Sequence, residues 1–159
     1  MPEASAAIRR FNRFYTREIG VLDGNLLKSG FSLAEARILY ELAHTPEIAA
    51  TEIGEKLNLD RGYLSRMLRA FQRKRLITRK TDATDKRRSH LLLTDKGRMT
   101  FAQLDRGSSE AAAGMIATLP PGEVNALLGA METIQGILSK DTPAPNYVLR
   151  RDRVGVHAT

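Results

Sequence analysis

The chain has 159 residues, 42% of them hydrophobic and 6% aromatic, which is enough for one domain with a real core and little more. It contains no Cys, which excludes disulfides, thiolate zinc sites and cysteine nucleophiles. No apolar run reaches the roughly 18 residues that a membrane span needs, and the N-terminus lacks an apolar signal core. We therefore expect a soluble, cytoplasmic protein that has no membrane partner.

The net charge of +7 is concentrated in one segment. Residues 61–90 contain eleven Lys and Arg against Asp82 and Asp85, a net charge of +9. The rest of the chain, with 14 basic and 16 acidic residues, carries −2. An ordinary solvated face normally mixes the two signs, so this segment favours a polyanionic partner.

Two helices are expected before this basic segment. Apolar residues recur at three- and four-residue steps over 4–22, which predicts an amphipathic helix. Ser32 is a suitable N-cap for a second helix over 33–44, which should end near Thr45-Pro46. This second helix is apolar around much of its circumference, which indicates a central position.

A short helix, a tight turn and a longer helix follow. Thr51 is expected to cap the short helix over 52–58. Asp60 is expected to cap the longer one over 61–76. Such a helix-turn-helix can place its second helix in a major groove roughly 12 Å wide, and the small residue Gly54 permits the two helices to approach closely.

The longer helix has two opposed faces. At about 100° per residue, Leu64, Leu68 and Phe71 form one stripe that should be buried, and three arginines lie on the opposite side. An ordinary amphipathic surface helix is the alternative, but such helices carry acids among their bases, and residues 61–75 contain none. Arginine pairs with guanine edges or phosphates, so we expect DNA contacts from this helix. The candidates are Arg61, Tyr63, Ser65 and Arg66 at bases or adjacent phosphates, Arg69 and Arg73 at phosphates, and Gly62 where the backbone approaches DNA.

Two short strands, 77–80 and 90–93, should enclose a polar loop over 81–88. A hairpin whose tip carries basic residues can insert into a minor groove, and Lys86, Arg87 and Arg88 are the candidates. For Asp85 two interpretations stay open. In the first, its carboxylate forms a salt bridge that orients Arg87 or an arginine of the longer helix. In the second, Asp85 is an ordinary turn residue.

The C-terminal part is expected to be helical as far as residue 139. Thr94 should cap a long helix to about Leu119, which Pro120-Pro121 ends, and a last helix should span 122–139. The tail over 141–159 contains Pro, is basic and shows no helix periodicity.

The order of these elements and three motifs resemble the MarR family of bacterial regulators over about residues 5–140. The motifs are Ser65-Arg66-Met67-Leu68 in the longer helix, Asp85-Lys86-Arg87 in the hairpin, and Leu93-Thr94-Asp95-Lys96-Gly97. A closer likeness is to the regulator halves of proteins that fuse this domain to a GNAT-type N-acetyltransferase, in segments 11–23, 31–44 and 147–151. Because the chain stops at Thr159, we expect no acetyltransferase unit in it.

The resemblance implies a mainly α fold with a winged helix-turn-helix lobe over 32–94 and dimerisation helices over 4–22 and 95–140. Together these would form a single domain over 1–140, followed by the tail. It also implies a homodimer that binds a pseudo-palindromic operator. The terminal helices carry more apolar residues than so small a monomer could bury: Ile8, Phe11, Tyr15, Met115, Ile116, Leu119, Val124, Leu127, Leu128 and Met131.

Release of DNA on binding a small aromatic or anionic ligand is a further implication of the resemblance. The pocket candidates are Phe11, Tyr15, Tyr40 and His44, with Arg37 or Arg13 as an anion partner. Core packing is the alternative for the aromatic residues, and helix termination is the alternative for His44.

No cofactor, metal or catalytic residue is expected. The three histidines (His44, His90 and His157) do not have zinc-site spacing, and no nucleophile-base set is evident, so we do not expect an enzyme. The expected function is a ligand-responsive transcriptional repressor that binds double-stranded DNA. A sequence-neutral DNA-packaging protein, or the remnant of a bifunctional regulator and acetyltransferase, are the alternatives.

Overall fold

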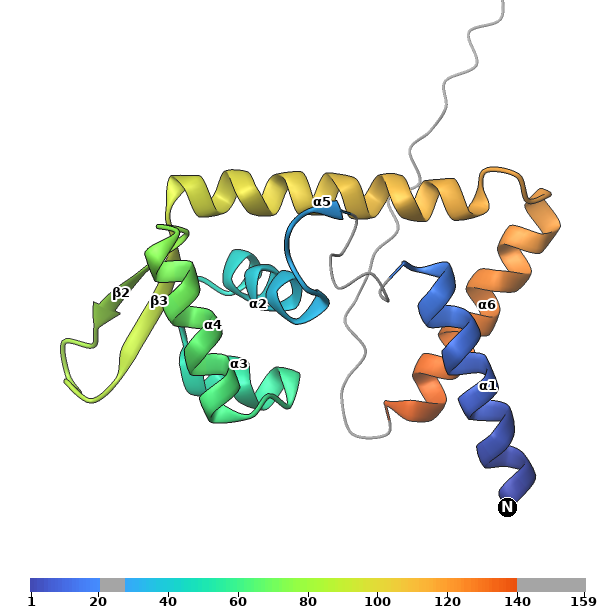
Figure 1. Cartoon of the computed structure of the whole chain (residues 1–159), viewed down its shortest axis with the longest axis horizontal. Coiled ribbons are helices and arrows are strands. Elements are labelled where there is room, and N and C mark those ends of the chain that lie inside the picture. Colours follow the sequence, from blue (N-terminus) through green and yellow to red (C-terminus); the bar gives the residue numbers. More distant parts are fainter. Residues whose placement is uncertain (21–27, 140–159) are drawn as a thin grey trace, which may run out of the picture. The chain divides into compact units, whose positions relative to one another are not determined.

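The computed structural model describes residues 1–20 and 28–139 (Figure 1). The chain divides into two compact units, residues 1–115 and residues 116–159. The described residues form helices and a small antiparallel sheet, which confirms a mainly α fold with a winged helix-turn-helix. No described helix is both long enough and apolar enough to cross a membrane.

Helix α2 (Leu33–His44) begins and ends where the sequence predicts. The hydroxyl of Ser32 accepts from the backbone N–H of Glu35 at 3.2 Å, and the Glu35 carboxylate accepts from the N–H of Ser32 at 2.8 Å. This reciprocal capping box satisfies two helix-start donors that would otherwise lack partners. Ile38 and Leu39 on α2 are fully buried, so the helix lies at the centre of the lobe.

The helix-turn-helix consists of α3 (Ala50–Leu57) and α4 (Arg61–Arg73). The predicted cap at Thr51 is wrong, because α3 begins at Ala50, two residues before the predicted start, and Ala49 is its N-cap. The cap of α4 is confirmed, since the Asp60 carboxylate accepts from the N–H of Tyr63 at 2.9 Å. Between the helices Asn58 is left-handed, with φ +49°, which ends α3 in a tight turn.

The sheet contains β1 (Ile48–Ala49), β2 (Ile77–Thr81) and β3 (Ser89–Leu93) in the order β1-β3-β2. All neighbours are antiparallel, and the β2–β3 hairpin pairs residue 77 with 93 and residue 81 with 89. The sequence predicts the hairpin but not β1, because two residues are too few to show a period. Pairing of Ile48 with Leu91 ties the start of the helix-turn-helix to the hairpin.

The core of the lobe draws on every one of these elements. Its fully buried side chains come from α2, α3, α4 and the sheet, and Leu104 of α5 (Asp95–Ile116) adds to the cluster. The largest of them are Phe71, Ile38, Leu39, Ile48, Ile53, Leu68 and Leu91.

The end of α4 is joined to the start of α5 by a dense set of hydrogen bonds. Arg75 is left-handed, with φ +58°, and its carbonyl accepts from the Thr94 hydroxyl at 2.7 Å. That hydroxyl also accepts from the N–H of Gly97 at 3.0 Å, which is the cap predicted for Thr94. A Cβ at Gly97 would lie 2.0 Å from the carbonyl oxygen of Leu76, so only glycine permits this approach.

The terminal helices are α1 (Pro2–Glu18), described with the first unit, and α6 (Pro121–Leu138), in the second. Neither helix has a buried residue. The predicted first helix, 4–22, thus starts earlier and ends at Glu18, and α5 ends at Ile116 rather than near residue 119. Positions 21 and 22 of that helix, and the predicted tail over 141–159, lie outside the described residues.

Candidate nucleic-acid interface

Helix α4 exposes one basic face and buries the other. Leu64, Met67, Leu68 and Phe71 are buried, as their helical spacing predicts for three of them. The opposite side is exposed and consists mainly of arginines. We call this side the arginine face: Arg66, Arg69 and Arg73, with Arg61 in the first turn.

Within the described residues, no arginine of this face forms an ion pair. Arg69 donates to the Ser65 hydroxyl at 3.3 Å, and the guanidinium of Arg66 lies 5.9 Å from the centre of the Tyr63 ring. These neutral contacts orient the side chains and leave their charge uncompensated. Gly62 is also exposed at the start of the helix.

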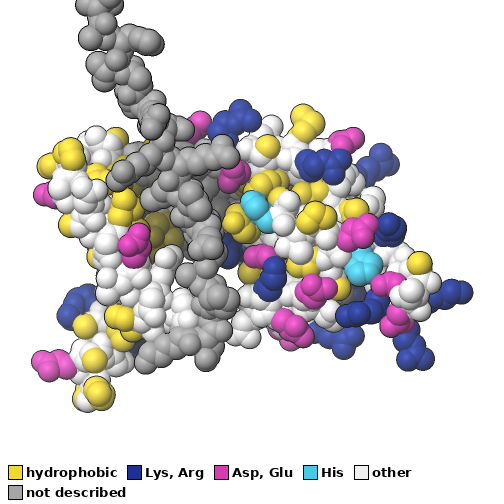
Figure 2. All heavy atoms as spheres, turned by 180° about the vertical axis from the view of Figure 1, so that it is seen from behind, with side chains coloured by type: hydrophobic (Ala, Val, Ile, Leu, Met, Phe, Trp, Pro, Cys, Tyr) yellow, Lys and Arg dark blue, Asp and Glu magenta, His cyan; other side chains and the backbone are white. Residues whose placement is uncertain are grey.

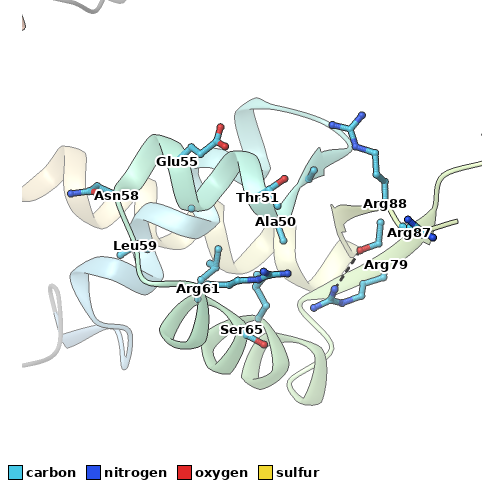
Figure 3. A pocket seen from close by; sticks show the side chains of 15 residues that line it. Ala50, Thr51, Glu55, Asn58, Leu59, Arg61, Ser65, Arg79, Arg87 and Arg88 are labelled. Carbon is cyan, nitrogen blue, oxygen red and sulfur yellow. Dashed lines mark hydrogen bonds between the residues drawn. The ribbon is translucent and has the colours of Figure 1, made fainter. Parts of the chain in front are cut away.

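An open pocket with a volume of about 670 Å³ lies between the start of α4 and the hairpin (Figure 3). Four arginines and one acid line it, with Arg61 on α4, Arg79 on β2, Arg87 and Arg88 on the hairpin, and Glu55 on α3. Arg79 was not a sequence candidate. It donates to the Ser89 hydroxyl across the hairpin at 3.4 Å, and only the strand register shows that it faces this concavity.

The basic side chains on the visible surface are also concentrated near the hairpin (Figure 2). In Figure 2 most Lys and Arg side chains lie around the winged lobe and its hairpin. The hairpin residues from Ala83 to Arg88 are all exposed, so Lys86, Arg87 and Arg88 are accessible, as the sequence predicts.

Asp85 acts in the structure as a turn residue. Its carboxylate accepts from the backbone N–H of Arg87 at 2.9 Å, and its carbonyl accepts from the N–H of Arg88 at 2.9 Å. No described arginine forms an ion pair with it. The salt-bridge interpretation is therefore corrected. Asp85 orients the backbone of Arg87 and not its guanidinium, because the short side chain folds back onto its own turn.

His90, which the sequence analysis did not assign to the site, bridges two parts of the lobe. Its Nδ1 lies 2.7 Å from the carbonyl oxygen of Glu47, and its Nε2 lies 3.0 Å from a carboxylate oxygen of Asp82. The hydrogen bond with Asp82, and then that with Glu47, raise the pKa of His90 above its usual value. Hydrogen bonds from Thr84, and then from His90, hold the pKa of Asp82 well below its usual value.

A second cavity, of about 710 Å³, lies between α1, α2 and α5 in the first unit. Tyr15, Arg37 and Tyr40, three of the six predicted pocket residues, line it. Phe101, Leu104 and Asp105 of α5 also line it, and the sequence did not indicate them because no local pattern brings α5 beside α2.

The other three predicted pocket residues do not line this cavity. Phe11 stacks on Tyr15 with ring centres 5.7 Å apart, and Arg13 is exposed. His44 stacks on Tyr40 at 4.0 Å and its Nδ1 lies 2.8 Å from the carbonyl oxygen of Tyr40, in the last turn of α2. This is the helix-terminating role that was the alternative for His44.

No group of three or more His, Cys, Asp or Glu in the described part of the chain could hold a metal ion.

Residues 29–88, which contain α2, the helix-turn-helix, β2 and the loop before β3, match the family described as the MarR family. This segment of the chain is similar to the winged helix of MarR-family regulators. A protein similar to this chain is the putative transcriptional regulatory protein for the hcr operon of Thauera aromatica. It is 25% identical over 139 residues, which cover 87% of this chain and 77% of the relative.

Two solved structures show the same fold. The transcriptional repressor CouR bound to a 23-mer DNA duplex is 26% identical, with a TM-score of 0.67, and the match covers 79% of this chain and 89% of CouR. BpsR of Bordetella bronchiseptica, whose DNA binding is regulated by 6-hydroxynicotinic acid, is 15% identical, with a TM-score of 0.64. That match covers 82% of this chain and 98% of BpsR.

Proposed function

We propose that this protein is a sequence-specific DNA-binding transcriptional regulator that binds a pseudo-palindromic operator as a homodimer. The observation that carries the proposal is the arginine face of α4, which is exposed and forms no ion pair among the described residues. One basic concavity lies between this face and the arginines of the β2–β3 hairpin, Ile77–Leu93, which we call the wing. A recognition helix in the major groove and a basic hairpin at the adjacent minor groove require this geometry. The DNA-bound structure of the similar repressor CouR supports it.

The proposed contacts divide into two classes. N-terminal residues of a recognition helix usually meet base edges, and later ones meet the backbone. We assign Arg61, Tyr63, Ser65 and Arg66 to bases or adjacent phosphates, Arg69 and Arg73 to phosphates, and Gly62 to a close backbone approach. Lys86, Arg87 and Arg88 of the wing, with Arg79 beside them, are assigned to the minor groove and its phosphates.

Exposed apolar side chains on two helices support the homodimer. On α1, Ile8 is 61% exposed and Phe14 is 50% exposed, and on α6, Ile137 is 60% exposed. Apolar side chains at this density on helices without a buried residue are usually covered by another chain. A second copy that covers both helices would also present two arginine faces to successive major grooves.

The cavity between α1, α2 and α5 supports a repressor that responds to a small molecule. Its walls are mainly aromatic and aliphatic, with the acids Glu18 and Asp105, and Arg37 supplies a cation 5.4 Å from the Tyr40 ring. Such a site suits a small ligand with an aromatic or anionic part, and the regulation of BpsR by 6-hydroxynicotinic acid supports this proposal. We propose no catalytic role and expect the protein to act in the cytoplasm. The predicted kinship with acetyltransferase fusions rests partly on segment 147–151, outside the described residues.

Selection of bound fragments from the source genome, followed by footprinting, tests the proposal. We expect one protected site of about 20 base pairs with two related half-sites about one helical turn apart. Uniform protection of random fragments would instead support the sequence-neutral DNA-binding alternative and contradict a regulator.

A further inference from the structure

We propose that His90 is the positioning residue of the wing, and that it holds Arg87 and Arg88 in place for DNA only as the doubly protonated imidazolium. The DNA part of this inference rests on the proposed function, whereas the wing geometry stands independently of it.

The two ring nitrogens of His90 both face acceptors. Nδ1 lies 2.7 Å from the carbonyl oxygen of Glu47, which can only accept, and Nε2 lies 3.0 Å from the carboxylate of Asp82, which also accepts when ionised. A neutral imidazole has one N–H and can satisfy only one of these contacts. The observed arrangement is therefore complete only when both nitrogens carry hydrogen.

Asp82 passes this constraint on to the tip of the wing. Its other carboxylate oxygen accepts from the N–H of Thr84 at 2.8 Å, from the Thr84 hydroxyl at 2.7 Å, and from the N–H of Asp85 at 3.3 Å. Asp85 in turn accepts from the backbone N–H of Arg87 and Arg88. A continuous series of hydrogen bonds thus runs from Glu47 through His90 to the two wing arginines.

The position of His90 in the sheet explains why it can act as this anchor. It lies on the central strand β3, opposite Ala49 of β1 and Lys80 of β2. The carbonyl that it bonds belongs to Glu47, just before β1, so the wing is attached to the buried part of the lobe and not only to its own hairpin.

The charges that face His90 come from three places. Asp82 faces it from the wing loop, and Glu47 faces it from the turn before β1. Lys80 of β2 lies opposite, but its ammonium pairs with the Glu47 carboxylate at 3.0 Å. Among the described residues, no charged side chain of α2 or α3, the helices that pack on β3, bonds or pairs with His90. The Asp82 carboxylate therefore dominates and favours the imidazolium.

The sign of the pH effect follows. Because the pKa of His90 is raised in the folded protein, the bridge is complete below the usual histidine value and is lost as pH rises through the raised one. Deprotonation leaves a ring lone pair facing either the Glu47 carbonyl or the Asp82 carboxylate. One contact becomes repulsive, and the tip is released from its anchor.

The test is an NMR titration of the full chain combined with DNA binding over the same pH range. The ring resonances of His90 report its pKa, and the amide signals of Thr84, Arg87 and Arg88 report the wing. We expect these amides to shift with the midpoint of His90 and their heteronuclear NOE to fall above it. The amides of Ser32 and Glu35 on α2 are the internal control and should not follow that midpoint. Kd for the selected operator should weaken about three- to tenfold across the same range, the effect of about one hydrogen bond.

Two variants separate positioning from charge. In Asp82→Asn the side-chain oxygen can still accept from Thr84, and the amide can donate to Nε2 of neutral His90. We expect the His90 pKa to fall and the pH dependence of the wing amides and of Kd near the His90 midpoint to disappear. Long-range attraction alone would instead make this more positive variant bind DNA more tightly with an unchanged pH profile. His90→Gln should bind several-fold more weakly at low pH and should also lose the pH dependence.

The two proposals fail in distinguishable ways. Wing amides that ignore the His90 midpoint, or an unchanged pH profile in His90→Gln, would overturn the inference. If the wing amides follow His90 but no fragment of DNA is selected, the bridge stands and the proposed function is wrong. If operator Kd is constant while the wing amides respond, the wing does not position its arginines for DNA and the inference fails.

Discussion

Arg66 and Arg73 lie on the same exposed face of α4, about two helical turns apart. We expect Arg66→Ala to weaken operator binding by roughly 1–3 kcal/mol and to relax the preference at one base position. Arg73→Ala should weaken all sequences alike and lower the slope of log Kd against log salt by about one unit. Competition between operator and random duplex at several salt concentrations measures both effects. Equal losses on operator and random DNA in Arg66→Ala would contradict its assignment to bases.

Gly97 is the residue at which the fold has least tolerance. A methyl group there would lie 2.0 Å from the carbonyl oxygen of Leu76 and 3.0 Å from a methyl carbon of Leu93. Because the first of these is backbone, we expect Gly97→Ala to lower the free energy of unfolding by about 1–3 kcal/mol or more. The measurement is urea unfolding.

Gly54→Ala is the matched control for Gly97→Ala. Its Cβ would meet a flexible Leu64 side chain at 3.4 Å, and alanine favours the helix, so its stability should stay within about 1 kcal/mol of the parent. Similar losses at both positions would show that the backbone contact at Gly97 is not the cause.

For single residues, the sequence predicted which side chains are exposed better than it predicted which side chains form hydrogen bonds with one another. The arginines of α4 were correctly placed on the solvent side, because one helical wheel is enough to decide that. The partners of Asp82, Asp85 and His90 were not, because they depend on the register of the hairpin, which joins residue 80 to 90. Arg79 was missed for the same reason.

Elements with local signals were predictable and those without were not. Ser32 was correctly predicted as the N-cap of α2, and its partner Glu35 is only three residues away. Strand β1 has two residues and exists through pairing with β3, more than 40 positions away. That pairing also places Ala49 at the start of α3, which is why Thr51, the better capping residue, lies inside the helix.

In the connection between α4 and α5, one hydroxyl both donates and accepts a hydrogen bond. Thr94 donates to the carbonyl of Arg75 and accepts from the N–H of Gly97. Thr94→Val keeps the shape and removes both bonds, so we expect it to lower the free energy of unfolding by about 1–2 kcal/mol. Thr94→Ser keeps the hydroxyl and should lose less than half of that in urea unfolding. Equal stability of the Val and Ser variants would contradict this role.

For the whole molecule, the exposed apolar residues of α1 and α6 predict association. Sedimentation equilibrium at micromolar concentration should give twice the 17.7 kDa chain mass. Ile8→Glu or Ile137→Glu should shift it toward the monomer, because a charge would be buried in the interface. Thr78→Glu is the control, since Thr78 is exposed on β2 of the winged lobe and should leave the mass unchanged. A monomeric parent chain would contradict the homodimer.

The charge of the whole molecule was the most informative property of the sequence. A net +9 within residues 61–90 indicated a polyanion before any element was assigned, and the structure places most of that charge on the surface of one lobe. The walls of the second cavity could not be anticipated, since Phe101 and Asp105 meet Tyr40 only through tertiary packing.

The missing side chain at Gly97 has a mechanical consequence. The backbone of α5 rests directly on the chain that leaves α4, with nothing compressible between them, and Thr94 pins both. Gly97 is thus the point of closest contact near the start of α5, a helix of 22 residues that is about 33 Å long. Because this contact joins backbone to backbone, we expect the start of α5 and the end of α4 to move together.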